Sequence, residues 1–243
     1  MKKILIGLSM IVFVATVAFA FGGNAPQSEP SRAPVVITQS GSVPDVFWVD
    51  DFESGSLSSP REWWVFDIKA TPVPNAALTA GDSSIANKVG KNSLQLKGNA
   101  NNWYAGGCGT YVAKENTDFS QYNSLQLDIY GNGAGSGTLK IEMIDDDNNN
   151  WNAEQDPAKN YLPIYDDKFV YDIRIDWSGW RRVIISLDDF VDDNSSVGDN
   201  IFNPSQIAGS GGLLQFQFIC LASKSSALVN FNVDNIALLK ITD

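Results

Sequence analysis

The chain has 243 residues, with 17 Lys and Arg against 28 Asp and Glu, two cysteines, no histidine and a formal net charge of −11. Without histidine, Ser-His-Asp catalysis and imidazole-bound zinc are excluded, and two cysteines are too few for an all-thiolate zinc site. The excess of acids argues against nucleic acid and anionic membranes as partners, because an acidic protein gains nothing from counterion release there. Calcium binding, carboxylate chemistry, an aromatic binding surface or a structural role remain.

Residues 1–20 have the pattern of a secretory signal peptide: two lysines, a short apolar run and an A-x-A cleavage signal at 18–20. We expect cleavage after residue 20 and export to the periplasm or beyond, with no membrane contact afterwards. An uncleaved anchor is the alternative, although the apolar run is short for a full span. Residues 21–44 are rich in Pro, Ser and Gly, which predicts a flexible lead-in. Residues 45–243 predict one domain.

Hydrophobic residues alternate with polar ones in several segments of this domain, which is typical of half-buried strands. The clearest inward series are Leu125, Leu127 and Ile129; Leu139, Ile141 and Met143; Leu214, Phe216, Phe218 and Cys220; and Phe231, Val233 and Ile236. We find no long amphipathic helix. About ten strands in one domain predict an all-β fold, a two-sheet antiparallel jelly-roll sandwich.

Acidic residues stand near both ends of the domain, in Asp50, Asp51 and Glu53 at its start and Asp234 near its end. The first and last strands of a sandwich are often neighbours, so these carboxylates could share one calcium ion. The alternative is a set of solvated acids that protect a sheet edge from aggregation.

A second acidic run, at 145–150, has the spacing with which an EF-hand loop begins. The sixth position is Asn150 and not the glycine that such a loop requires, and no flanking helices are expected. We therefore interpret this run as a polar hairpin tip.

The two cysteines, Cys108 and Cys220, both fall in predicted strands. In an exported protein they could form a disulfide, and the alternative is two buried thiols that pack as small hydrophobes.

Aromatic residues near predicted strand ends or loops are candidates for stacking on sugar rings. They are Trp64, Trp103, Tyr104 and Trp151, whereas Trp180 is expected in the core.

Several motifs together resemble the carbohydrate-binding modules of the galactose-binding-like jelly-roll group, families 4, 11 and 22 among them. They are V-D-D-F-E at 49–53, K-N-S-L-Q-L at 91–96, F-S-Q-Y-N-S-L-Q-L-D-I-Y-G at 119–131, G-W-R-R-V-I-I-S-L-D-D-F at 179–190 and F-N-V-D-N-I-A-L at 231–238. The match spans about residues 45–243, and Ser186 stands where proline is usual. The resemblance implies a ten-strand jelly roll.

The resemblance also implies a structural calcium ion on the convex side. Its ligands would be Asp51, Glu53, the carbonyl of Lys91 and Asp234. Sugar binding in the group lies on the concave sheet or its rim, where family motifs fix no residue. By alternation, the outward residues expected on that sheet are Lys140, Glu142, Tyr171, Gln215 and Gln217.

These observations favour an exported, non-catalytic protein that binds a poly- or oligosaccharide. The alternative is an extracellular structural or assembly protein, such as an envelope or flagellar-sheath component, with self-association or a protein partner. A small glycoside hydrolase or lyase is a third hypothesis. It needs two carboxylates across a cleft, and no pair is singled out by the sequence.

Overall fold

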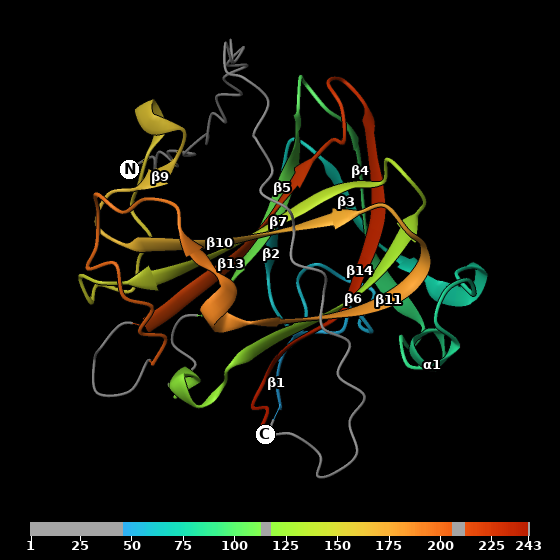
Figure 1. Cartoon of the computed structure of the whole chain (residues 1–243), viewed down its shortest axis with the longest axis horizontal. Coiled ribbons are helices and arrows are strands. Elements are labelled where there is room, and N and C mark those ends of the chain that lie inside the picture. The colour runs from blue at the N-terminus through green and yellow to red at the C-terminus, as the bar shows by residue number, and fades with distance from the viewer. Residues whose placement is uncertain (1–45, 113–117, 206–211, 243) are drawn as a thin grey trace, which may run out of the picture.

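The computed structural model describes residues 46–112, 118–205 and 212–242. The predicted signal peptide and lead-in lie outside these residues. The described chain is an all-β sandwich with fourteen strands, four short 3-10 turns and a single α-helix of four residues, α1 (Ser83–Ala86) (Figure 1). None of the helices in this part of the chain has the length and apolar character needed to cross a membrane.

Two antiparallel six-stranded sheets make up the sandwich, which confirms the predicted fold class. Sheet A has the order β11-β6-β14-β4-β3, and β1 also pairs with β14. Its strands are β1 (Val46–Asp50), β3 (Lys69–Pro74), β4 (Asn92–Asn99), β6 (Ser124–Asn132), β11 (Ser178–Ser186) and β14 (Leu228–Leu239).

Sheet B has the order β12-β10-β7-β13-β5-β2. Its strands are β2 (Trp63–Phe66), β5 (Tyr104–Tyr111), β7 (Gly137–Asp146), β10 (Asp167–Ile175), β12 (Val191–Asp192) and β13 (Gly212–Leu221). A separate two-stranded ladder joins β8 (Gln155–Asp156) and β9 (Leu162–Pro163). The structure has more than the expected ten strands largely because of short ones such as β8, β9 and β12. Strands of two residues are too short to show hydrophobic alternation in the sequence.

The inward side chains of both sheets form one core, as the alternation predicts. Leu127 and Ile129 of β6 face Ile141 of β7 and Phe218 of β13 within a single cluster of fully buried hydrophobic residues. Burial of such side chains stabilises the fold by about 1.5–3 kcal/mol each. This core fixes which side of each strand faces outward.

The ladder of sheet A is interrupted along β14. On one edge, β4 pairs with the first half of β14 up to Val233, and β1 pairs with the second half from Ile236 onward. Asp234 and Asn235 lie between the two partners, and Asn235 has a φ of 48°. The expected pairing of the first and last strands is therefore confirmed, and it leaves a gap in the ladder at Asp234.

The segment between β3 and β4 covers the outer side of sheet A at this gap. Ile85 and Val89 of this segment pack against Trp180 of β11, which is buried as expected, and the Trp180 Nε1–H donates to the carbonyl of Leu78 at 2.8 Å. α1 and the turn after it therefore form a lid over the polar groups of β6, β11 and β14.

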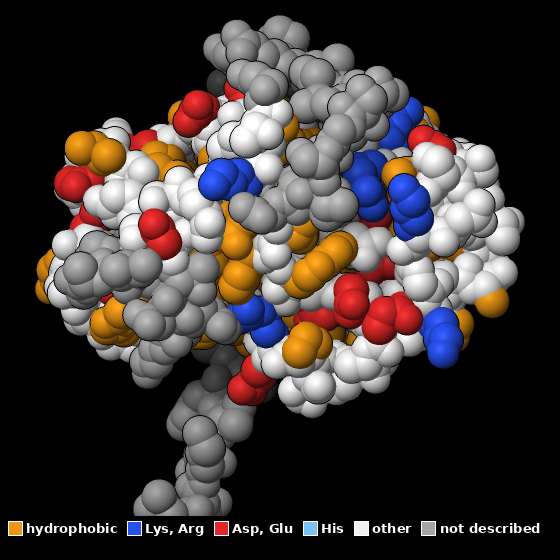
Figure 2. All heavy atoms as spheres, turned by 90° about the horizontal axis from the view of Figure 1, so that it is seen from below, with side chains coloured by type: hydrophobic (Ala, Val, Ile, Leu, Met, Phe, Trp, Pro, Cys, Tyr) orange, Lys and Arg blue, Asp and Glu red, His pale blue; other side chains and the backbone are white. Residues whose placement is uncertain are grey.

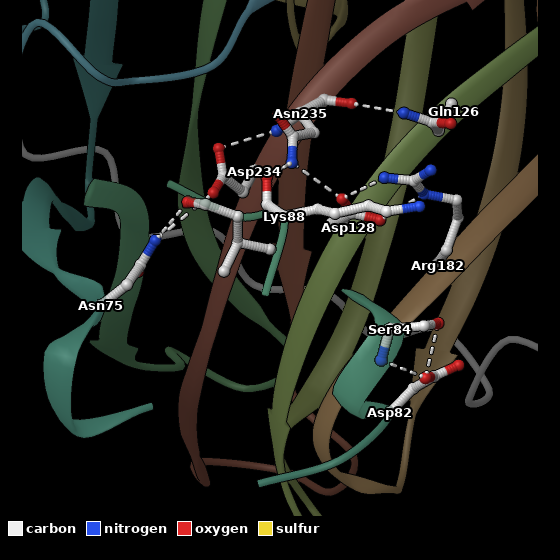
Figure 3. A network of polar contacts seen from close by, with 10 residues as sticks. Asn75, Asp82, Ser84, Lys88, Gln126, Asp128, Arg182, Asp234 and Asn235 are labelled. Atoms are coloured by element: carbon white, nitrogen blue, oxygen red, sulfur yellow. Dashed lines mark hydrogen bonds and ion pairs between the residues drawn. The ribbon is translucent and has the colours of Figure 1, made fainter. Parts of the chain in front are cut away.

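Beneath this lid, Arg182 of β11 makes a two-pronged pair with Asp128 of β6 (Figure 3). Its Nε and one terminal nitrogen each lie 2.7 Å from a different oxygen of the Asp128 carboxylate. Asp128 is fully buried, and the amide of Asn235 donates to it as well, at 2.8 Å. The guanidinium thus balances a carboxylate that water does not reach.

Replacement of Arg182 by alanine should lower the free energy of unfolding by about 3–5 kcal/mol, because it leaves the Asp128 charge buried and unpaired. Arg174→Ala is the matched control: its side chain is 73% exposed, and it meets Asp176 at 3.5 Å. That change should cost about 1 kcal/mol or less. Urea denaturation measures both values, and equal losses in the two variants would contradict the assignment.

Candidate functional site

The outer face of sheet B carries most of the predicted sugar-binding residues. The strand registers place Trp64 of β2 opposite Gly109 of β5, Gly109 opposite Gln217 of β13, and Gln217 opposite Glu142 of β7. Glu142 is in turn opposite Val170 of β10. These residues form one row across five adjacent strands, on the side away from the core.

Two aromatic rings lie over glycines in this face. A Cβ added to Gly109 would come within 2.4 Å of the Trp64 ring, and one added to Gly107 within 2.8 Å of the Phe66 ring. The glycines therefore leave the space that the two rings occupy against the β5 backbone. Tyr111, at the end of β5, packs beside Trp64 with 4.9 Å between ring centroids. The result is an aromatic group at the β2–β5 edge of the face.

Polar side chains lie next to this aromatic group. Gln215 and Gln217 of β13 point outward but are only 2% and 8% exposed, respectively. Gln215 is opposite Tyr111, and Gln217 lies between Gly109 and Glu142. An amide offers both donors and an acceptor, which suits the neighbouring hydroxyl groups of a sugar.

A chain of charges continues the face toward β12. The Lys168 ammonium lies 3.6 Å from Glu142 and 3.0 Å from Asp193, and the Lys140 ammonium lies 3.5 Å from Asp193. Burial raises the pKa of Glu142, although the positive charges of Lys168 and Lys140 oppose this. The groups alternate in sign across the surface.

Tyr104 lies at the far end of this face, at the start of β5. Its hydroxyl donates to Asp67 at 3.2 Å, and burial together with the Asp67 charge raises its pKa. Trp103 is half-buried in the turn that precedes β5, where its carbonyl accepts from Ala222 N–H. The row that holds Trp64 and Gln217 crosses β5 at Gly109, further along the strand from Tyr104.

The prediction for Tyr171 is wrong. Tyr171 is opposite Ile141, whose side chain belongs to the core, and its ring packs against Phe190 with 5.5 Å between centroids. The outward residues of β10 are Lys168, Val170 and Asp172, one position out of phase with the expectation. Alternation in this strand is weak, because a tyrosine and a valine occupy adjacent positions.

Trp151 is not on the sheet face. It lies in the long connection between β7 and β10, where its backbone N–H donates to Asp146 at 2.8 Å. Sequence reasoning also missed Phe66, Tyr111 and Lys168. The paired glycines 107 and 109 in a strand are a signal that could have indicated rings lying over β5.

The predicted calcium ligands Glu53 and Asp234 lie close together at the gap in sheet A, although Glu53 is exposed and only Asp234 is buried. Asp234 is fully buried; its Oδ1 accepts from Asn235 N–H at 2.8 Å, and the amide of Asn75 lies 3.5 Å from its Oδ2 (Figure 3). Burial raises the pKa of Asp234 to about 9, and the negative charges of Asp128 and Glu53 add to this. Unlike Asp128, Asp234 has no arginine beside it within the described chain.

Glu53 and Lys91 meet next to this carboxylate. One Glu53 oxygen accepts from the backbone N–H groups of Lys91 and Asn92, at 2.6 and 2.8 Å, and the Lys91 carbonyl accepts from Asn75 N–H at 2.7 Å. The side-chain oxygen of Asn75 is sealed from solvent and has no hydrogen-bond partner in the structure. Such an unpartnered buried oxygen fits a site for a hard cation.

Asp51 has no contact with Asp234 or Asn75 among the hydrogen bonds of the described residues. Its side chain is exposed, and its Oδ1 accepts from the N–H of Glu53 at 3.1 Å. Both oxygens of Asp50 are also engaged, by Phe52 N–H at 2.8 Å and by the Trp63 indole at 2.7 Å. Asn75, which sequence reasoning missed, is the residue that brings an additional oxygen to Asp234.

Cys108 and Cys220 are free, buried thiols in the structure, which favours the second of the two alternatives. Cys108 is opposite Phe218, and Cys220 is opposite Gly106. The two cysteines are thus diagonal neighbours on adjacent strands, about 7–8 Å apart at their Cα atoms by ladder geometry, beyond the usual reach of a disulfide. Burial raises the pKa of both thiols.

Comparison with known proteins gives the following findings. No protein-family model matches the sequence, and no curated protein matches it. A family 11 carbohydrate-binding module from Clostridium thermocellum, solved with a β-1,3-1,4-mixed-linked tetrasaccharide, has a TM-score of 0.49 and 18% identity, and the match covers 84% of this chain and 99% of that chain.

A family 11 module of the cellulosomal cellulase Lic26A-Cel5E of Clostridium thermocellum has a TM-score of 0.48 and 16% identity, over 83% of this chain and 98% of that chain. A family 30 module of the cellulosomal cellulase Cel9D-Cel44B from the same organism has a TM-score of 0.45 and 15% identity, over 76% of this chain and 95% of that chain.

The thiol arrangement can be checked with a thiol-reactive chromophore and no reductant. We expect no labelling of the folded protein, because both sulfurs are buried and protonated. In strong denaturant we expect two labelled thiols per chain, the full number of cysteines. A disulfide would instead leave both unlabelled in denaturant, and that result would contradict the assignment.

Proposed function

We propose that this protein binds a poly- or oligosaccharide on the outer face of sheet B. The observation that carries the proposal is the pair of rings, Trp64 and Phe66, that lie against the glycines of β5 beside the outward amides Gln215 and Gln217. A sugar ring has an apolar face of C–H groups and a rim of hydroxyls. Aromatic rings suit the first, and amides suit the second.

The charged groups of the face support binding without bond cleavage. A glycosidase needs one carboxyl group as acid and a second one placed across the scissile bond. Glu142 lies instead 3.6 Å from Lys168, which also meets Asp193. These contacts balance the carboxylates by a shared ammonium group, so we propose a non-catalytic role for them as hydrogen-bonding partners of sugar hydroxyls.

A structural calcium ion at Asp234 belongs to the same proposal. Asp234, Glu53, the side-chain oxygen of Asn75 and the Lys91 carbonyl would hold it. Its two positive charges would offset carboxylates that the protein leaves unbalanced on the side of sheet A that faces away from sheet B. Export, to the periplasm or beyond, is also part of the proposal, and it rests on the signal-peptide pattern of residues 1–20.

The assembly hypothesis gains no support from the surface in Figure 2. On that face, the hydrophobic side chains of the described residues form separate islands between acidic and basic ones. Contacts in a stable assembly usually use a larger continuous apolar patch.

Replacement of Trp64 by alanine should weaken polysaccharide binding at least tenfold, because it removes the larger ring of the aromatic group. Affinity electrophoresis through soluble β-glucans, xylans and mannans measures the effect as lost retardation. Trp48→Ala is the matched control, since Trp48 is 52% exposed on β1 of the opposite sheet. Equal retardation of both variants would place the site elsewhere, and no retardation of the wild type on any polymer would refute the proposal.

Removal of calcium with EDTA should lower the melting temperature, and added calcium should restore it. An ion present at one hundred times its dissociation constant stabilises the folded state by about 2.7 kcal/mol. The part of the calcium-induced rise in melting temperature that is due to the Asp234 site should be lost in Asn75→Ala. It should be retained in Asp176→Asn, which removes an exposed carboxylate. A calcium-induced shift of the same size in both variants would contradict the assignment of Asn75.

A further inference from the structure

A second group of carboxylates lies where β7 and β10 end. Asp147 directly follows β7, Asp167 is the first residue of β10, and Asp199 lies in the loop after β12. One oxygen from each of these three residues lies within 4.8 Å of the other two. Two ligands of one calcium ion, each 2.3–2.6 Å from it, can be up to about 5 Å apart, so one ion could touch all three.

Two of these carboxylates lack the partners that buried charges require. Asp167 is fully buried, and its Oδ1 has no hydrogen-bond partner; the Oδ1 of Asp147 is also sealed and without a partner. In the described parts of the chain, no lysine or arginine forms an ion pair with Asp147, Asp167 or Asp199. Burial raises the pKa of Asp147 to about 6, and the charge of Asp167 adds to this. A buried carboxylate oxygen that lacks both a hydrogen bond and an ion pair needs a donor or a cation.

The backbone around the group is shaped to bring the carboxylates together. Gly198 has a φ of 69°, and a Cβ added there would lie 2.0 Å from Asp167 Oδ1 and 2.4 Å from Asp147 Oδ2. The loop therefore passes directly against both side chains. Ile201 N–H donates to Asp167 Oδ2 at 3.2 Å and to Asp199 Oδ1 at 2.8 Å, so Asp167 Oδ1, like Asp147 Oδ1, is left without a hydrogen-bond partner.

The chemistry of the group selects the ion. All three side chains offer oxygen, with no nitrogen or sulfur ligand, which suits a hard divalent cation. Calcium accepts irregular geometry and takes further oxygens from carbonyls and water, whereas magnesium requires a near-ideal octahedron. Asp199 is exposed, so an ion can enter from solvent.

We propose that Asp147, Asp167 and Asp199 form a calcium site that ties the β7–β10 connection to the loop after β12. This site is separate from the one at Asp234, which lies on the other sheet. The β7–β10 connection carries Trp151 and the exposed tyrosines 161 and 165. The ion would hold this aromatic segment at one end of the sheet whose outer face we propose for sugar binding.

Calcium titration by calorimetry, together with metal analysis after equilibrium dialysis against calcium chloride, tests the site. Asp147→Asn and Asp199→Asn should each weaken one binding event at least tenfold, because each removes a charged ligand. Gly198→Ala should have the same effect without any change of charge, since its Cβ would occupy the space of the two carboxylates. Asp199 is exposed, so its variant should fold even if the others do not.

Two control variants make the result specific. Asp188→Asn removes an exposed acid elsewhere and should bind as the wild type does. Asp234→Asn should leave this site intact, so its loss of binding at the other site is counted separately. Wild-type calcium affinity and stoichiometry in Asp147→Asn, Asp199→Asn and Gly198→Ala would overturn the proposal, as would a wild-type protein that binds no calcium. None of these readouts depends on sugar binding, so they also distinguish this proposal from the proposed function.

Discussion

The placement of buried carboxylates without a full set of counter-charges is the constraint on which the rest of this structure depends. β14 crosses the centre of sheet A. Its ladder breaks at Asp234, where its pairing with β4 stops and its pairing with β1 has not yet started. The break puts a carboxylate under the segment between β3 and β4, beside one that Arg182 balances. Close-packed hydrophobic residues stabilise the interior, whereas these polar groups determine where the loops lie.

The two sheets consequently have outer faces of different kinds. The outer side of sheet A is covered around Asp234 by α1 and its flanking turns, which supply Asn75 and Lys88 as hydrogen-bonding partners for β14. The outer side of sheet B has aromatic rings at one edge and a chain of charges at the other, with amides between them. Polar contacts on the first face stabilise the fold, and the second is the surface that we propose for sugar binding.

Much of this arrangement could be predicted from the sequence. Alternation in β6, β7 and β13 identified the inward residues with the exception of Leu214, where a bulge puts Leu213 into the core instead, and it gave the outward positions of Glu142, Gln215 and Gln217. Tyr171 was misassigned because the adjacent residues Val170 and Tyr171 do not show which of them points inward. Only the pairing of β10 with β7 determines this. Asn75 and Asp199 could not be found, since each reaches its group from a loop whose path depends on tertiary packing. The alternating glycines 107 and 109 indicated that something lies over β5. The rings that do so belong to β2, which pairs with β5 although β3 and β4 separate the two strands in the chain.

The glycines beneath Trp64 and Phe66 bear on how well this face is ordered before a ligand arrives. With backbone as their support, the rings lie low on the sheet, and the amides of β13 beside them are almost inaccessible to solvent. Side chains that are packed in this way have few rotamers left to lose, so ordering them on binding costs little conformational entropy. The face that we propose for sugar binding is therefore preorganised, and its rings and amides need little rearrangement to meet a ligand.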